Sequence, residues 1–172
     1  MNILITYSSK TGNTKKLAEG IYEGLSIENK TILPMNEVQS LEEYDIVLGG
    51  YWVDKSGPNE EAKKFLSTIK GKKVGLFATL AYWPDTEHAW QSLVNGENLV
   101  KEDNTVIAKY ICQGKLDERV IAMFEKLPED NPHSVTPEKR LRYEIAKKHP
   151  SKADIESAAE LFEERLSLYV SK

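Results

Sequence analysis

Residues 1–14, MNILITYSSKTGNT, decide the fold of this chain. Residues 2–7 are mostly apolar and β-prone, a run long enough for one buried strand and too short for a typical helix. Small hydroxyl, amide and glycine residues dominate the next stretch, and apolar residues then recur at helical spacing from Leu17 to Leu25. This pattern predicts a strand, a tight polar loop and a helix.

The polar loop predicts an anion site and consists of Ser8, Ser9, Lys10, Thr11, Gly12, Asn13 and Thr14. Unpaired backbone N–H groups at a helix N-terminus and the helix dipole both favour an anion, and Gly12 lets the backbone approach it closely. Neither the GxxxxGK[ST] nor the GxGxxG phosphate motif is present here. The alternative is a Ser/Thr-rich loop that only caps the helix.

Strands and helices alternate along the rest of the chain. Further strands are predicted at residues 30–35, 44–50, 73–79 and 105–112, with helices after Pro58, from about Thr86 and from near Ser151. The alternation predicts right-handed crossovers and a three-layer αβα fold around a five-stranded parallel sheet of order 2-1-3-4-5. We expect residues 1–172 to form one domain, with an added helical segment at about residues 115–150.

Aromatic residues follow the third and fourth predicted strands. Ligands of such sheets bind at the carboxyl ends of the strands, where the polar loop also lies. The candidate lining residues are Gly50, Tyr51, Trp52 and Val53 in one loop, and Thr79, Leu80, Ala81, Tyr82 and Trp83 in the other. A flat, phosphorylated ligand suits this combination.

Residues 9–14, SKTGNT, resemble the [ST]xTGxT phosphate loop of flavodoxins, and they stand at the first strand as in that family. The resemblance covers about residues 1–114 and 151–170 and implies bound FMN. It places Trp52 on one face of the flavin ring and Tyr82 or Trp83 on the other. Backbone groups of residues 50–53 and 79–82 would meet the polar edge of the ring. Trp52 could instead belong to the core.

Composition excludes several classes of protein. The 172 residues carry a net charge of −4, which argues against a nucleic-acid partner. No run reaches the roughly 18 apolar residues of a membrane span, and no signal peptide is evident, so we expect a cytoplasmic protein with no membrane partner. The single Cys112 is expected to be buried and structural, and the histidines lack metal-binding spacing.

The resemblance implies an electron carrier that shuttles electrons between a reductase and an acceptor, its redox partner proteins, as a monomer or weak homodimer. Acidic residues near the aromatic loops, such as Asp54 and Asp85, would form its docking rim. No catalytic residue is assigned. One alternative is an FMN-dependent NAD(P)H:quinone-type reductase. Another is a partner subunit that keeps the fold but no longer binds FMN. The basic residues between Thr136 and His149 are a solvated helix face, a docking surface or an oligomer contact.

Overall fold

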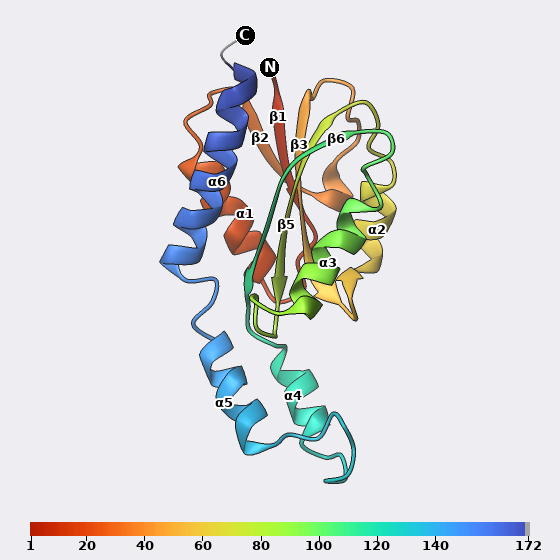
Figure 1. The fold of residues 1–172 in the computed structure, drawn as a ribbon, viewed down its shortest axis with the longest axis vertical. Helices are drawn as coiled ribbons and strands as arrows, with labels where there is room; N and C mark the ends of the chain where they lie inside the picture. Colours follow the sequence, from red (N-terminus) through yellow and green to blue (C-terminus); the bar gives the residue numbers. More distant parts are fainter. Residues whose placement is uncertain (171–172) are drawn as a thin grey trace.

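A parallel sheet forms the middle layer of the computed structural model, which describes residues 1–170 (Figure 1). Its parallel strands are β1 (Ile3–Tyr7), β2 (Lys30–Pro34), β3 (Ile46–Asp54), β5 (Lys73–Leu80) and β6 (Thr105–Gln113). They lie in the order β2-β1-β3-β5-β6, which is the predicted 2-1-3-4-5 when these five are counted alone. The fold class and the position of the switch point between β1 and β3 are therefore as predicted.

The sheet has a sixth strand that the sequence prediction missed. β4 (Gly57–Pro58) pairs antiparallel with the end of β3, where Val53 lies opposite Pro58. The predicted loop after residue 50 is therefore strand as far as Asp54, because residues 51 and 52 still pair with β5. Pro58 lies in this edge strand, where it needs no ladder donor. It does not open the next helix, which begins after Asn59.

Helices cover both faces of the sheet (Figure 1). α1 (Asn13–Gly24) and α6 (Lys152–Val170) pack on one face, where Leu17 and Phe162 join a core with β1 and β3. α2 (Glu60–Leu66), α3 (Glu87–Glu97) and the short 3₁₀ helix η1 (Met35–Glu37) pack on the other, around Leu66 and Tyr51. Both faces of the parallel sheet are thus buried, as such sheets require.

The added segment contains two helices, α4 (Glu118–Phe124) and α5 (Pro137–Ala146). Figure 1 shows both helices beyond the end of the sheet toward which β5 points, below the body of the molecule. Each has a side-chain cap: Asp117 accepts from the amide of Arg119, and Thr136 accepts from the amide of Lys139. The segment therefore lies at the carboxyl ends of the strands, where ligands of this fold bind.

Candidate functional site

The loop between β1 and α1 leaves a helix N-terminus open to an anion. Gly12 takes the N-cap position with φ 87°, and no side chain caps the helix there. The first turn carries no acidic residue. Within residues 1–170, the backbone amides of residues 9–14 donate to no protein acceptor. The predicted loop therefore presents a row of free N–H donors, which a bound anion would satisfy.

The side chains of the loop are partly engaged with one another. The Ser9 hydroxyl accepts from the amide of Lys15 at 3.2 Å, and the Thr11 hydroxyl accepts from the side-chain amide of Asn13 at 2.8 Å. The Thr14 hydroxyl is buried and lies 2.9 Å from that of Thr79, at the end of β5. Ser9 and Thr11 thus remain at the surface of the loop, whereas Thr14 ties the loop to the sheet.

Ser8 was predicted in the anion site, but the structure turns its side chain toward α2. The hydroxyl is 3% exposed, donates to the Glu61 carboxylate and accepts from the Asn59 side-chain amide at 2.8 Å. Its role in this structure is to fix the start of α2 beside the loop. The Glu61 carboxylate that accepts this hydrogen bond lies in the first turn of α2.

A first hollow of about 540 Å³ lies beside the loop. This volume suits a small-molecule site. Lys10, Thr11 and Asn13 line it on the loop side, and residues 52–55 line it from the end of β3. Trp52 is half-buried, and the Lys10 ammonium lies 5.2 Å from its ring centre. The loop and the predicted stacking residue therefore share one cavity.

The residues of the second aromatic loop, which ends β5 and follows it, line two different cavities. Thr79, Leu80 and Ala81 line the first hollow. Tyr82 lines a neighbouring second hollow, where it packs edge to face against His88 with 6.0 Å between ring centres. Trp83 lines neither, and its carbonyl accepts from the Thr86 hydroxyl at 2.8 Å. Of the two adjacent aromatics, Tyr82 is therefore the one that faces a cavity.

Gly50 and Tyr51 contribute to the sheet and not to a cavity wall. A Cβ at Gly50 would lie 2.0 Å from the Phe77 ring, so glycine allows that ring to pack against the strand. Tyr51 is fully buried in the core, and its hydroxyl donates to the Ser92 carbonyl at 3.0 Å. Burial raises the pKa of this phenol. The expectation of an aromatic side chain beside the ligand is therefore wrong for Tyr51.

The added segment forms the remaining wall of the first hollow, which the sequence prediction missed. Leu116, Val120 and Phe124 come from α4 and the residues just before it, and His133 comes from the loop that follows. The Phe124 and His133 rings are stacked, with centres 5.4 Å apart. The only usable signal in the sequence was topological, because this segment follows a strand that ends at the same edge.

Asp117 places a negative charge on the first hollow. Hydrogen bonds from the side chain and the backbone of Arg119 lower the pKa of its carboxyl to about 2, and the Lys10 charge adds to this effect. Asp54 lines the same hollow. The site therefore combines an N–H-rich loop that carries Lys10 with two carboxylates that line the same hollow.

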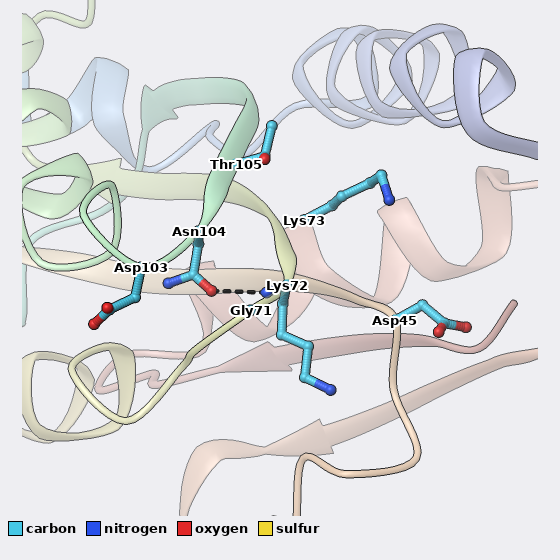
Figure 2. Close-up of a pocket in the computed structure, with 7 residues that line it drawn as sticks. All are labelled: Asp45, Gly71, Lys72, Lys73, Asp103, Asn104 and Thr105. Carbon is cyan, nitrogen blue, oxygen red and sulfur yellow. Dashed lines mark hydrogen bonds between the residues drawn. The ribbon is translucent and has the colours of Figure 1, made fainter.

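A third hollow, of about 530 Å³, lies at the other end of the sheet and holds none of the predicted site residues. Figure 2 shows its side chains, including those of Lys72, Lys73 and Asp103, pointing away from one another. The one hydrogen bond drawn there joins the Asn104 side chain to the Lys72 amide, at 2.9 Å. These turns precede the strands, so this hollow lacks the converging groups of a ligand site.

Other kinds of site find no support in residues 1–170. Within that range no cluster of His, Cys, Asp and Glu side chains could hold a metal ion. None of the helices described there has the length and apolar character needed to cross a membrane. Cys112 is buried, and burial raises the pKa of its thiol, so it lacks the exposed thiolate of a reactive cysteine.

Comparisons with known proteins agree with this architecture. The flavodoxin of Streptococcus pneumoniae TIGR4 superposes with a TM-score of 0.63 at 14% identity, covering 99% of this chain and 100% of that one. A Fusobacterium nucleatum flavodoxin, bound to flavin mononucleotide, gives 0.55 at 12% identity over 95% and 97% of the two chains. At such low identity, these likenesses show that the chain has the α/β fold of the flavodoxins.

Sequence comparison is more specific. The flavodoxin domain model matches residues 4–163. The flavodoxin-like domain-containing protein BilS of Clostridioides difficile is 35% identical over 166 residues, which cover 92% of this chain and 93% of that protein. The chain therefore belongs to the flavodoxin family.

Proposed function

We propose that this protein binds FMN noncovalently and carries electrons between a reductase and an acceptor. One observation carries the proposal: the uncapped N-terminus of α1, with its free amides, lies on the same hollow as Trp52. An N–H-rich loop suits a phosphate monoester, and a half-buried indole suits a flat ring. The F. nucleatum flavodoxin bound to flavin mononucleotide supports the choice of ligand.

The residues present fit this cofactor. The amides of residues 9–14 would bind the phosphate, with the Ser9 and Thr11 hydroxyls beside them. Trp52 and the added segment would enclose the ring and exclude water from it. When bound, FMN supplies the ability to accept and release electrons singly or in pairs, and the protein supplies binding and electrostatics.

Charge around the hollow would set how readily the site accepts electrons. Asp54 and Asp117 line it, and Asp117 remains ionised at all ordinary pH values because its pKa is lowered to about 2. A fixed negative charge opposes the arrival of another, so these carboxylates would lower the reduction potential. We infer that the exposed acidic residues around the opening receive basic redox partners, in the cytoplasm, with the protein as a monomer or weak homodimer.

A second candidate function is an FMN-dependent NAD(P)H:quinone-type reductase. The observation that favours it is the second hollow, which adjoins the first and shares Leu80, Ala81 and Phe124 with it. A carrier that meets its partners only at an exposed cofactor edge does not need such a cavity. The two functions differ in whether a small molecule can reduce the bound flavin without a partner protein.

An anaerobic reductive titration separates these functions. The FMN-loaded protein is titrated with dithionite and, separately, with NADPH, while its visible spectrum is followed. We expect reduction by dithionite in two separable one-electron steps and no reduction by NADPH alone. Bleaching by NADPH without an added reductase would contradict the carrier and favour the reductase. Protein that takes up no FMN at all would favour a subunit that keeps only the fold.

A further inference from the structure

The second hollow is a cavity of about 690 Å³ between the body of the protein and the added segment. Tyr82 and His88 line it from the body, and Lys139, Arg142 and Tyr143 line it from α5 and its start. Its volume lies within the range of small-molecule sites. Because it shares residues with the first hollow, a ligand here would lie beside a ligand there.

The charge of this cavity is opposite to that of the whole protein. Lys55, Lys139 and Arg142 line it together with His88 and His133, and within residues 1–170 no aspartate or glutamate does so. The chain as a whole has a net charge of −4. A concave surface with charges of one sign concentrates ligands of the other sign. The cavity therefore selects against cations.

Among these residues, Arg142 points most directly to an anionic ligand in the second hollow. Its guanidinium lies 4.5 Å from the Tyr82 ring centre and 5.5 Å from that of Tyr143, so aromatic rings hold it in place. Its Nε is buried without a hydrogen-bond partner among the described residues, and no carboxylate there pairs with it. Arg140, on the same helix, pairs with Glu125 at 2.8 Å. A guanidinium with free donors in a cavity suits a bidentate anion.

Two lysines support the same reading of the cavity. The Lys139 ammonium donates to the Pro132 carbonyl at 2.5 Å and to the Ser134 carbonyl at 2.9 Å. These contacts fix its position without neutralising its charge. Lys55 lies in the two-residue turn between β3 and β4, with φ 60°. Its side chain adds a further positive charge to the wall that this cavity shares with the first hollow.

We propose that the second hollow binds a small, flat, anionic molecule, with its ring against Tyr82 and Phe124 and its anionic group on Arg142 and Lys139. The aromatic lining takes the ring, and the unpaired guanidinium takes a carboxylate or phosphate. That this ligand would lie beside a flavin rests on the proposed function, but its binding does not. Carboxylated aromatic molecules and nucleotides share this chemistry.

The test compares an anionic aromatic probe with its uncharged analogue. Binding of 8-anilinonaphthalene-1-sulfonate and of N-phenyl-1-naphthylamine to the full chain is measured by calorimetry, with and without FMN. We expect the sulfonate to bind at least fivefold more tightly than the neutral probe. Arg142→Gln should abolish this preference, and the matched Arg140→Gln should keep it. Equal affinity for the two probes, or equal effects of the two substitutions, would overturn the proposal.

Further arms of the experiment identify the ligand class and guard against misfolding. Displacement of the sulfonate by 2-naphthoate supports a site for carboxylated aromatic molecules, and displacement by NADPH supports a site for nucleotides. Displacement by neither overturns the proposal. Lys139→Gln provides a second test if Arg142→Gln does not fold. FMN affinity is measured separately on each protein. FMN binding without probe binding would refute this inference alone, and the reverse would refute only the proposed cofactor.

Discussion

At the scale of single residues, substitutions at two glycines can distinguish an effect on protein stability from an effect on FMN binding. Gly12 and Gly71 both have positive φ, 87° and 67°, and a Cβ at either would meet no atom within 4 Å. Each substitution by alanine should therefore lower stability by a similar amount, about 1 to 2 kcal/mol. Gly12 lies on the anion loop, whereas Gly71 lies on the third hollow, at the opposite end of the sheet.

We expect Gly12→Ala to weaken FMN binding about tenfold or more, because it disturbs the backbone that presents the amides. Gly71→Ala should leave FMN affinity unchanged. Urea unfolding gives the stabilities, and quenching of FMN fluorescence gives the affinities. If both variants lose FMN affinity equally, the effect is one of general stability, and the loop is not the phosphate site.

Tyr51 shows what a local pattern fails to predict. A tyrosine after two glycines resembles a loop residue, but β3 continues through it because its backbone pairs with Ala78 of β5. Gly96 makes room for the phenol, since a Cβ there would lie 2.5 Å from its oxygen. This partner is 45 positions away in the printed sequence, so no motif could indicate it.

Tyr51→Phe should therefore act on stability and not on the ligand. The variant loses the hydrogen bond to the Ser92 carbonyl, and we expect unfolding free energy to fall by about 0.5 to 1.5 kcal/mol. FMN affinity should stay the same within twofold. A tenfold loss of FMN affinity with unchanged stability would show that Tyr51 belongs to the binding site.

At the scale of elements, α4 is expected to act as a wall of the cofactor site. Phe124 lines both hollows, whereas Met123, its neighbour on the same helix, is 56% exposed. Phe124→Ala should weaken FMN binding about three- to tenfold, in line with the loss of an aromatic contact. Met123→Ala is the matched control, and fluorescence titration measures both. Equal FMN affinities of the two variants would show that α4 does not contact the flavin ring.

The start of α6 predicts a pH dependence of stability. Asp154 accepts from the amide and the hydroxyl of Ser151 at 2.6 and 2.8 Å and lies 2.6 Å from Nδ1 of His149. Partial burial raises the pKa of Asp154, but the hydrogen bonds from Ser151 and His149 outweigh it and leave the pKa below the usual 3.8. The ionised carboxylate thus stabilises the fold above that value, and this contribution is lost as the pH falls below it.

Asp154→Asn should lower stability at pH 7 by about 1 kcal/mol, the usual size of a helix cap in a partly solvated position. It should also flatten the fall in stability between about pH 5 and pH 3. Urea unfolding over this pH range measures both effects, with the exposed Asp85→Asn as control. An acid transition identical to that of the unmodified protein would remove Asp154 from this role.

The strand and helix order of the whole molecule could be read from the sequence because each element is specified locally. Residues 2–7 carry the apolar pattern of a strand, and apolar residues from Leu17 to Leu25 follow the helical period, so both patterns can be read without knowing the contacts. The packing of the added segment could not be read in this way. The Asn13 side chain reaches the Lys115 carbonyl across 102 positions, at 2.9 Å, and Phe124 meets the first hollow without any motif.

Whether the loop at Gly12 holds the phosphate of FMN can be tested with a flavin that lacks the phosphate. Apoprotein is titrated with FMN and with riboflavin, which has the same ring system and no phosphate, and flavin fluorescence is followed. We expect one FMN per chain and an affinity for riboflavin lower by more than about tenfold, since hydrogen bonds to a charged group contribute about 1.5 to 3 kcal/mol each. Equal affinities for the two flavins, or no binding of either, would contradict it.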